Sequence, residues 1–464
     1  PHLVRGAEPK LTITVWKNKE IISAEAGDKR AKLYGFAVDV GTTKLAGYLV
    51  DLNLGTIAAA VSSTNPQIPY GEDVISRMSF VMKDPKGLSQ LQTLIIKEIN
   101  KLILEACIRV HATPDQVHEV TVVGNTAMHH IFFGIYPGHV ALAPYPTVLK
   151  DSIDVKAKDL RIDINPCSNI HGLPLIAGFV GADAVADILA TQMYASEDIT
   201  MMIDIGTNTE IVIGDKNKLT ACSCASGPAF EGAHIKNGMR ASTGAIERVY
   251  IDPDTFKIGY VTVDNAKPSG VCGSGAVDAV AEMLRKRVID SSGRIKTELD
   301  LPNVRVKNKT SELVLARAGE TASGHDIVIT QEDVRQIQLA KAAIYSGISI
   351  LMRQLDIEAG DISKVFMAGA FGTYVDSQSA GVIGMYPDIP LSRVQFVGNA
   401  AGSGARMALM SIDMRERAEE ISEKVQYIEL GADSNFQNEF LNATYLPHKD
   451  LELFPNIGRL LQHR

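Results

Sequence analysis

Cysteine is scarce in this sequence, and its spacing fits neither a disulfide framework nor a common metal motif. The 464 residues include five cysteines, an odd number for so long a chain. A disulfide-stabilised secreted protein is therefore unexpected, and a reducing cytoplasm is the simpler location. No C-x₂-C pair occurs. We expect Cys222, Cys224 and Cys272 to be small buried residues that pack a loop. The alternative, ligation of a cluster, lacks a fourth thiolate in this region.

Long apolar runs and an excess of positive charge are also missing. No apolar run approaches the roughly 18 residues of a membrane-spanning helix, and no secretory signal opens the chain. Lysine and arginine number 46 against 54 acidic residues, and the net charge of −8 disfavours nucleic-acid binding. The histidines lack the H-x₃-H and HExxH spacings of metal sites. We expect His118, His129 and His130 to be hydrogen-bonded or surface residues, with the last two on opposite helix faces.

The start of the chain is polar and carries only one strand pattern. The first residue is Pro1, and we interpret the sequence as a piece of something longer. Residues 11–24 contain one alternating segment, LTITVWKN, which predicts a strand. Residues 25–30 form a polar break. We therefore interpret residues 1–32 as a linker remnant.

The remaining sequence repeats one plan of strand, tight turn and strand, followed by a long helix and a further strand. An apolar fraction of 45% with 22% charged residues is typical of a globular protein. At roughly 100–200 residues per domain, the length predicts two large lobes. The first copy consists of a hairpin at 34–51, a helix at 89–111, a strand at 119–125 and a helix at 126–133. The second consists of a hairpin at 199–215, a helix at 331–352, a strand at 364–369 and a strand–helix pair at 394–410.

Two pairs of short segments support this duplication. VDVGTT at 38–43 matches IDIGTN at 203–208 with an offset of 165 residues. VVGNTA at 122–127 matches FVGNAA at 396–401 with an offset of 274 residues. The larger second offset predicts an insertion in the second copy. Self-similarity of this kind indicates two copies of one supersecondary unit, and a cleft between two lobes is a preferred ligand site. We place the first lobe at 33–197 and the second at 198–464.

The two D-x-G-T turns have the composition of phosphate-binding loops. Gly41 lets the backbone turn tightly and approach a ligand, and Thr42 and Thr43 add hydroxyl groups. Successive N–H groups in such a turn form an anion-binding concavity. Asp39 and Asp204 could hold Mg²⁺ through water, because Mg²⁺ dehydrates reluctantly. The second loop contributes Gly206, Thr207, Asn208 and Thr209.

One such turn alone would more often be an ordinary hairpin turn, but two copies in matching contexts favour nucleotide binding. The role of Lys44 stays open between neutralising phosphate charge and being a solvated surface lysine. Asn125 and Asn399 follow predicted strands, and we expect them to make backbone hydrogen bonds between the lobes.

Three further segments fit a nucleotide site. The small residues of MAGAFG, which include Gly369, Ala370 and Gly372, would let an adenine ring lie against the backbone. In SGPAFEG, Gly227 shapes a turn and Glu231 could accept ribose hydroxyls, although this loop could equally position the helix after it. Asp183 is expected at the start of a helix. It is either an N-cap residue or a catalytic carboxylate that orients or deprotonates the nucleophile.

These features together predict an α/β protein of the two-lobed actin, sugar-kinase and chaperone ATPase type. Over nearly its whole length the chain resembles the reductive activators of corrinoid enzymes, the family that includes RACo. The resemblance rests most specifically on NPQIPYGEDVISRM at 65–78 and CASGPAFEGAHI at 224–235. It is also carried by YGFAVDVGTTKLAGYLVDL, VVGNTAMHH, IDIGTNTEIVIG, CGSGAVDAV, QLAKAAIYSGI, MAGAFG and VGNAAGSGARMAL.

The resemblance implies a function. Members use ATP to drive one electron into a corrinoid protein whose cobalt has become inactive Co(II), and so restore Co(I). Many carry the electron on an N-terminal ferredoxin-like [2Fe–2S] domain, and others use C-terminal cysteine motifs. This sequence lacks the ferredoxin spacing and has no cysteine after Gly431. We therefore expect it to be the ATPase part, with ATP and Mg²⁺ as ligands, a corrinoid protein as partner and a homodimer as the assembly.

Two other classes of function compete. A small-molecule kinase of the sugar-kinase class is favoured by Asp183, which precedes the second loop. An actin-like or chaperone-like protein would instead use ATP to control assembly. A closer relative, the activator of acyl-CoA dehydratases, needs a bridging cluster whose local sequence is not matched here.

Overall fold

The computed structural model describes residues 10–369 and 375–462. The chain forms two compact units. Unit 1 comprises Pro1–Tyr194 and Asn399–Tyr427, and unit 2 comprises Ala195–Gly398 and Ile428–Arg464. Each unit has a hydrophobic core of its own. The predicted two-lobed α/β fold is confirmed.

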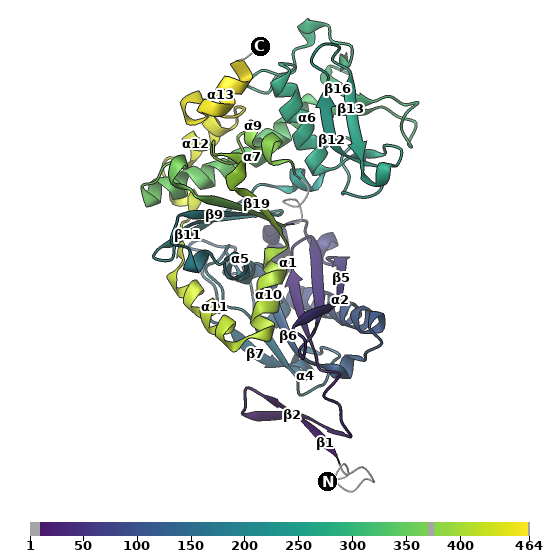
Figure 1. Cartoon of the computed structure of the whole chain (residues 1–464), viewed down its shortest axis with the longest axis vertical. Coiled ribbons are helices and arrows are strands. Elements are labelled where there is room, and N and C mark those ends of the chain that lie inside the picture. Colours follow the sequence, from purple (N-terminus) through teal and green to yellow (C-terminus); the bar gives the residue numbers. More distant parts are fainter. Residues whose placement is uncertain (1–9, 370–374, 463–464) are drawn as a thin grey trace. The chain divides into compact units, whose positions relative to one another are not determined.

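A mixed sheet lies at the centre of unit 1 (Figure 1). Its strands lie in the order β5-β4-β3-β6-β8-β7. β3 pairs antiparallel with β4 and parallel with β6. The strands are β3 (Tyr34–Val40), β4 (Lys44–Asp51), β5 (Thr56–Thr64), β6 (Val117–Val123), β7 (Ile153–Lys156) and β8 (Asn169–Gly172). The helices are α1 (Val74–Lys83), α2 (Gly87–Arg109), α3 (Thr126–Phe133), α4 (Ala157–Leu160), α5 (Ala182–Thr191), α10 (Ala400–Met410) and α11 (Ile412–Lys424), and the short strand β20 (Gln426–Tyr427) follows α11.

Unit 2 contains a sheet of the same design. It holds the strands β19-β18-β9-β10-β11 in that order. β9 pairs antiparallel with β10 and parallel with β18. The strands are β9 (Thr200–Ile205), β10 (Thr209–Gly214), β11 (Leu219–Cys224), β18 (Lys364–Ala368) and β19 (Val394–Gly398). The helices are α6 (Gly273–Arg285), α7 (Gln331–Leu355), α9 (Ser377–Val382), α12 (Phe436–Ala443) and α13 (Pro455–Gln462).

The duplication is visible in the strand order. The series β5-β4-β3-β6-β8 of unit 1 corresponds to β11-β10-β9-β18-β19 of unit 2. Two glycines mark the equivalent points. A Cβ on Gly124, after β6, would lie 2.7 Å from the carbonyl oxygen of Val40, and one on Gly369, after β18, would lie 2.5 Å from that of Ile205. Val40 and Ile205 are separated by the predicted 165 residues.

The second matched pair of segments was interpreted wrongly. FVGNAA contains the end of β19, whereas VVGNTA contains the end of β6, and the counterpart of β6 is β18. Both segments end a parallel strand and begin a helix, and this shared local task explains their similarity. Position in the sheet, which the sequence comparison could not see, pairs Gly124 with Gly369 instead.

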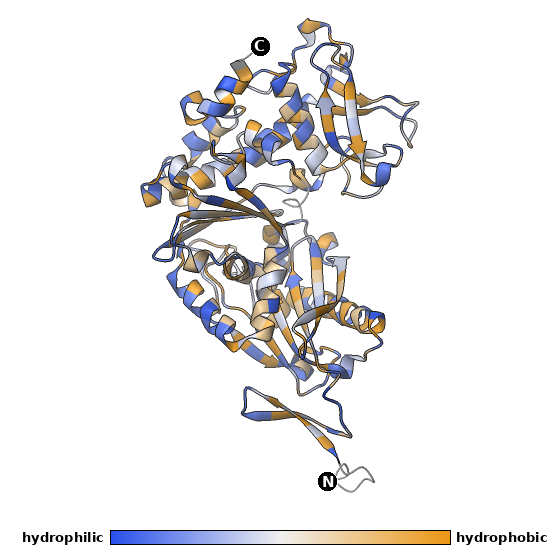
Figure 2. Cartoon of the chain, in the orientation of Figure 1, coloured by the Kyte–Doolittle hydropathy of each residue, from blue (hydrophilic) through white to orange (hydrophobic). Residues whose placement is uncertain are grey.

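The predicted lobe boundary also differs from the structure at 399–427, which belongs to unit 1. The reason is the packing of α10 against α5 and β3. α10 is rich in small residues, and a Cβ on Gly404 would lie 2.0 Å from the carbonyl oxygen of Ala186 in α5. The two helix backbones therefore touch, which only glycine permits. Figure 2 shows the charged α11 largely in blue, in contrast to the more apolar α10.

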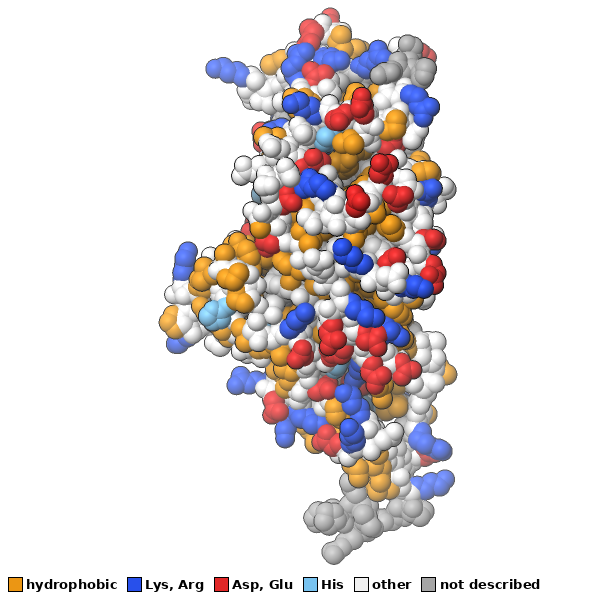
Figure 3. All heavy atoms as spheres, turned by 90° about the vertical axis from the view of Figure 1, so that its left-hand side faces the viewer, with side chains coloured by type: hydrophobic (Ala, Val, Ile, Leu, Met, Phe, Trp, Pro, Cys, Tyr) orange, Lys and Arg blue, Asp and Glu red, His pale blue; other side chains and the backbone are white. Residues whose placement is uncertain are grey.

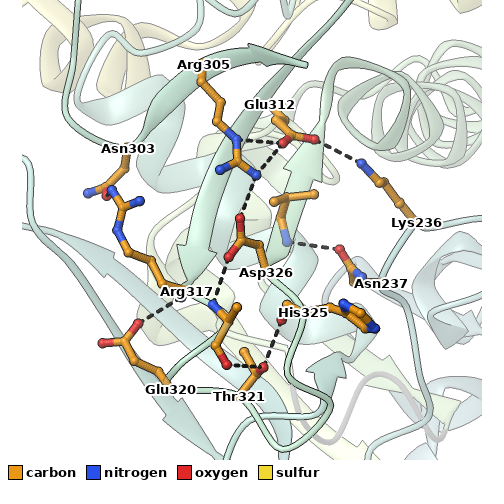
Figure 4. A network of polar contacts seen from close by, with 12 residues as sticks. Lys236, Asn237, Asn303, Arg305, Glu312, Arg317, Glu320, Thr321, His325 and Asp326 are labelled. Atoms are coloured by element: carbon orange, nitrogen blue, oxygen red, sulfur yellow. Dashed lines mark hydrogen bonds and ion pairs between the residues drawn. The ribbon is translucent and has the colours of Figure 1, made fainter. Parts of the chain in front are cut away.

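The predicted insertion of the second copy consists of two small sheets. They contain β12 (Ala245–Ile251), β13 (Ile258–Thr262) and β14 (Gly270–Val271), and β15 (Val304–Lys307), β16 (Thr310–Ala316) and β17 (Ile327–Thr330). Figure 4 shows how ion pairs fix the second sheet. Buried Glu312 accepts from Arg305 at 2.8 Å and from Lys236 at 2.9 Å, and Arg305 also pairs with Asp326 at 2.8 Å. Lys236 belongs to the segment after SGPAFEG, so the insertion is anchored beside that loop.

The predicted linker remnant contains a hairpin. β1 (Leu11–Trp16) pairs antiparallel with β2 (Glu20–Ala26), a strand that the sequence reading missed. The turn places Lys17 and Asn18 at positive φ. Leu11, Ile13, Val15 and Ile21 are exposed, and Figure 3 shows apolar side chains at the surface of this region.

Trp16, the single tryptophan of the sequence, attaches the hairpin to the body of unit 1. Its indole Nε1 donates to Glu119 on β6 at 3.0 Å. The same carboxylate oxygen accepts from the guanidinium of Arg415 on α11 at 2.7 Å. Three segments that are distant in sequence therefore converge on Glu119.

Substitution Glu119→Ala is expected to loosen this junction. The buried Arg415 would lose its carboxylate, which should lower the free energy of unfolding by about 2–3 kcal/mol. Trp16 would become more solvated, so its emission should shift to the red. Thermal unfolding with tryptophan fluorescence measures both effects. The control Lys17→Ala removes the more exposed Lys17–Asp154 pair, and should change stability by less than about 1 kcal/mol. An unchanged emission spectrum in Glu119→Ala would contradict this role of Glu119.

Candidate functional site

The first D-x-G-T loop connects β3 and β4 of unit 1. Asp39 lies near the end of β3, opposite Ala46 of β4. A Cβ on Gly41 would lie 2.6 Å from the carbonyl oxygen of Lys44, so the turn requires glycine. Thr42 and Thr43 are half-buried, and Lys44 is exposed. The hairpin prediction is confirmed, whereas the role of Lys44 stays a prediction.

Two asparagines hold the polar side chains of this loop. The Nδ2 of Asn399 donates to Oδ2 of Asp39 at 2.9 Å, and the Nδ2 of Asn125 donates to Oγ1 of Thr42 at 2.9 Å. Asn125 also caps α3 and Asn399 caps α10 through their side-chain oxygens. The structure therefore uses both side chains inside unit 1, not for the expected backbone bonds between lobes. An asparagine at a helix start offers an acceptor to the helix and a donor to a neighbour.

Asp183 lies close to the same loop along the backbone. It is in the first turn of α5, whose N-cap is Gly181 and not Asp183. Its backbone N–H donates to the carbonyl of Gly124 at 3.4 Å. Since β6 pairs with β3 so that Val123 lies opposite Asp39, this contact brings the start of α5 to the carboxyl end of the sheet. The N-cap interpretation is wrong, and the catalytic interpretation stays a prediction.

The second loop, between β9 and β10 of unit 2, has the same form. Asp204 lies opposite Glu210, and the N–H of Gly206 donates to the carbonyl of Asn208 at 3.0 Å. Buried Thr209 shares a hydrogen bond of 2.8 Å with Ser226. The turn itself is half-buried, so its polar groups lie near the surface of the unit.

SGPAFEG lies against this second loop, as the sequence suggested. The N–H of Gly227 donates to the carbonyl of Thr207 at 3.1 Å. The hydroxyl of Thr207 donates to Oε1 of Glu231 at 3.0 Å. Gly227 adopts φ +73° with open space around its Cβ position, so the turn needs glycine for conformation and not for space. Contact between Glu231 and a ribose stays a prediction; in the structure the carboxylate accepts from Thr207.

Gly369 brings a third segment to the second loop. A Cβ at this position would lie 2.6 Å from Oδ1 of Asp204, and the residue adopts φ +87°. β18 is in register with β9, so that Ala368 lies opposite Asp204. The segment that was expected to lie near the loops therefore begins beside Asp204. Ala370 and Gly372, predicted for the same site, lie outside the residues that the structure describes.

Substitution Gly369→Ala is expected to destabilise unit 2. The positive φ and the overlap with Ile205 and Asp204 together should lower the free energy of unfolding by about 2–4 kcal/mol. Chemical denaturation measures this change. Gly360→Ala is the matched control, because a Cβ at Gly360 meets nothing within 4 Å. If the two variants are equally stable, the close approach of Gly369 to Asp204 is not required.

Sequence reasoning missed the residues that lie behind the first loop. Asn65, Gln67 and Arg77 belong to the NPQIPYGEDVISRM segment, which was recognised as specific but received no structural role. All three are buried. Arg77 donates to the carbonyl of Thr42 at 2.5 Å, and Asn65 Nδ2 donates to that of Gly41 at 2.8 Å. A buried polar cluster 22 or more residues downstream of the loop leaves no periodic signal in the sequence.

The cysteines and histidines do not form a metal site in the described ranges. Cys222, Cys224 and Cys272 are buried, as expected, and the first two lie against Gly347 of α7. Over residues 10–369 and 375–462, no group of three or more His, Cys, Asp or Glu side chains could hold a metal ion. Within the same ranges, no helix has the length and apolar character that a membrane span requires.

On α3 the histidine prediction was wrong for His129, whereas His130 is hydrogen-bonded as expected. His129 and His130 are both buried, with ring centroids 5.9 Å apart. His130 accepts from the N–H of Val148 at 3.2 Å, but neither ring nitrogen of His129 has a hydrogen-bond partner among the described residues. Burial lowers the pKa of His129 to about 3 and that of His130 to about 4. Both rings are therefore neutral at physiological pH.

Each unit thus presents an aspartate, a tight turn and threonine hydroxyls at the carboxyl end of a central strand. Burial raises the pKa of Tyr48 on β4, and the nearby negative charge of Asp39 raises it further. Backbone N–H groups of a tight turn bind anions, and carboxylate oxygens suit hard divalent cations. Such a set of donors is adapted to a phosphate group with Mg²⁺ rather than to a soft metal.

Comparison with known proteins identifies the family. The RACo middle region matches residues 34–196, and the C-terminal ASKHA domain of RACo matches residues 198–458. The corrinoid activation enzyme RamQ of Eubacterium limosum is 36% identical over 450 residues, which cover 96% of this chain and 75% of the relative. The [Co(II) methylated amine-specific corrinoid protein] reductase of Methanosarcina barkeri is 25% identical over 475 residues, or 93% of this chain and 82% of the relative.

A solved structure supports the same assignment. The reductive activator for a corrinoid, iron–sulfur protein aligns with a TM-score of 0.86 and 38% identity, covering 94% of this chain and 69% of the other. The alignment covers nearly the whole of this chain. The chain belongs to the RACo family of corrinoid activators.

Proposed function

We propose that this chain is the ATPase part of a reductive activator that returns a corrinoid protein from Co(II) to Co(I). The observation that carries the proposal is the pair of D-x-G-T loops, built at the same point of two duplicated sheets in a chain of this family. The names of its relatives, a corrinoid activation enzyme and a corrinoid protein reductase, support the choice of partner.

In this proposal each of the two loops is a phosphate-binding element for ATP. Thr42 and Thr43 with their backbone N–H groups hold phosphate oxygens in unit 1, and Thr207 and Asn208 do so in unit 2. Asp39, which accepts from Asn399, and Asp204 are the carboxylates that would hold Mg²⁺. Mg²⁺ would neutralise the charge that develops on the transferred phosphoryl group. Gly369 lets the backbone after β18 approach Asp204 closely. Asp183, at the start of α5, orients the attacking water.

The redox step is a one-electron reduction. An external low-potential donor gives one electron to Co(II), which becomes Co(I), while ATP and water become ADP and phosphate. Nucleotide can promote this step only if it binds one arrangement of the activator–corrinoid complex more tightly than another. Because such coupling is reciprocal for binding, the corrinoid protein should change the affinity for ATP by the same factor.

A reconstituted reaction tests the proposal. The chain is mixed with a methylated-amine-specific corrinoid protein or a corrinoid, iron–sulfur protein in the Co(II) state, with a chemical low-potential reductant. We expect Co(I), followed by its absorbance, to accumulate with ATP and not with ADP, and phosphate release to rise when the corrinoid protein is present. The proposal would be refuted if Co(I) formed independently of ATP and the rate of phosphate release did not change with either corrinoid protein. A phosphorylated product from a screen of alcohols and carboxylates would favour a kinase instead.

A further inference from the structure

A buried arginine lies directly behind the first loop. Arg77, on α1, has no exposed surface and is the largest fully buried side chain of the described residues. Its Nε donates to the carbonyl of Gly71 at 2.9 Å, and its two terminal nitrogens reach Gln67 and Met128 at 3.2 Å and Thr42 at 2.5 Å. The guanidinium therefore connects the NPQIPYGEDVISRM segment to the loop.

The contacts orient the peptide groups of the loop. Arg77 donates to the carbonyl of Thr42, and the Nδ2 of Asn65 donates to the carbonyl of Gly41. The backbone N–H of Asn65 donates to the carbonyl of Thr43 at 2.9 Å. In a trans peptide the C=O and the following N–H point in opposite directions. The carbonyls of Gly41 and Thr42, directed at Asn65 and Arg77, therefore turn the N–H groups of Thr42 and Thr43 away from them. This is the arrangement of an anion-binding concavity.

The charge of Arg77 is not neutralised locally. In the described ranges no carboxylate lies within ion-pair distance of its guanidinium, whose partners are carbonyl, amide and thioether groups. Burial lowers the pKa of Arg77 to about 10, and the charge of Asp73 opposes this shift. The group is therefore still protonated at neutral pH. An unpaired buried cation is costly unless something compensates for it, and an anion held at the loop would do so.

We propose that Arg77 is a phosphate-positioning residue, which acts through Thr42 by fixing the loop carbonyls inward and by placing one positive charge behind the bound phosphates. The inference rests on the ATP binding proposed above and assigns a role to the family-specific segment 65–78. It predicts that the contribution of Arg77 to binding grows with the number of phosphates on the ligand, which a purely structural role does not.

The test compares adenosine, ADP and ATP, each with Mg²⁺, by calorimetric titration of the whole chain. Substitution Arg77→Met removes the charge at similar volume. It should lower the affinity for ATP at least about 30-fold, for ADP about 10-fold and for adenosine no more than about 3-fold, because the lost attraction scales with ligand charge. Arg77→Lys keeps the charge, so it should retain the wild-type ratio of ATP to adenosine affinity within about 3-fold.

Two further variants separate charge from folding. Gln67→Glu places a carboxylate beside the guanidinium and should reduce the ATP-to-adenosine ratio, although it also loses the Nε2 bond to the carbonyl of Leu91. This variant and Arg77→Lys decide the matter if Arg77→Met does not fold. Arg415→Met is the matched control, because Arg415 is a buried arginine of the same unit that faces Glu119. It should lower the melting temperature without changing the ratio.

The outcomes are distinguishable. If the wild-type chain binds no ATP, the proposed function fails. Suppose that it binds ATP but that the Arg77 and Gln67 variants lower the affinities for adenosine and ATP by equal factors, or change neither affinity. Then only the role of Arg77 is overturned. A graded loss from adenosine to ATP in Arg77→Met or Gln67→Glu, absent in Arg415→Met, supports it.

Discussion

Substitution Asp39→Asn or Asp204→Asn is expected to reduce ATP turnover at least about 100-fold while the chain stays folded. Asparagine has the shape of aspartate but lacks the negative charge that attracts Mg²⁺. Asp39 also accepts a hydrogen bond from Asn399, which an asparagine oxygen can still accept. The loss should therefore appear in turnover and in Mg²⁺ dependence, measured by phosphate release over a range of Mg²⁺ concentrations, and not in the melting temperature.

The two hairpins supply their own controls. Asp51 lies at the far end of β4, and Asp215 follows β10 at the far end of the second hairpin. Both carboxylates accept backbone N–H groups of turns. Asp51→Asn and Asp215→Asn should keep turnover within about 2-fold, because a surface turn contributes little to a site at the other end of the strands. Turnover that is unaffected in Asp204→Asn or Asp39→Asn would exclude these residues from the reaction.

Acid is expected to destabilise unit 1 because of the two buried histidines on α3. The pKa of His129 is lowered to about 3 and that of His130 to about 4, from an unfolded value of 6.5. The unfolded chain therefore binds protons that the folded chain excludes, so stability is full above pH 6.5 and falls as the pH drops toward the folded values. Between pH 7.5 and pH 5 each histidine should cost about 2 kcal/mol.

Denaturation followed by the fluorescence of Trp16 measures this effect, because that tryptophan belongs to unit 1. Substitution His129→Leu should remove about half of the loss between pH 7.5 and pH 5, and should cost little at neutral pH because it deletes two unsatisfied nitrogens. His139→Gln is the control, since His139 is exposed in the same unit. An acid response that is identical in all three proteins would show that other groups cause it.

Unit 2 contains a group with the opposite response. Burial raises the pKa of Asp278 on α6 to about 6, despite the nearby Arg248. A carboxylate with a raised folded pKa opposes folding at neutral pH, and protonation near pH 5 relieves about 1 kcal/mol of that cost. Because the group lies in unit 2, the Trp16 signal should not report it unless the two units unfold together.

The local elements of the site could be predicted because each depends on a few consecutive residues. The helix predicted at 331–352 is α7 (Gln331–Leu355), and the helix predicted at 126–133 is α3. Their limits follow from apolar periodicity and from caps such as Thr330. The two turns could be found because Gly41 is fixed by its own hairpin, where a Cβ would meet Lys44. The offset of 165 residues then relates the two copies.

What joins these elements could not be predicted. Asn399 reaches Asp39 across 360 residues, Arg415 reaches Glu119 across 296, and Arg77 reaches the carbonyl of Thr42 across 35. Each contact satisfies a buried polar group with a partner from another element, and no local pattern specifies which element that is. Gly124 was paired with the wrong segment for a related reason, because the position of a strand in the sheet is set by its neighbours there.

The sequence by itself thus determined the two D-x-G-T turns, the duplication around them and the family, because turn chemistry and periodicity act over short spans. Only the tertiary structure decided what holds the loops. It assigned 399–427 to unit 1 through backbone contact between α10 and α5, and it placed a buried guanidinium behind Thr42. The physical reason is that close packing and the pairing of buried polar groups are properties of assembled elements, and they do not exist until the chain has folded.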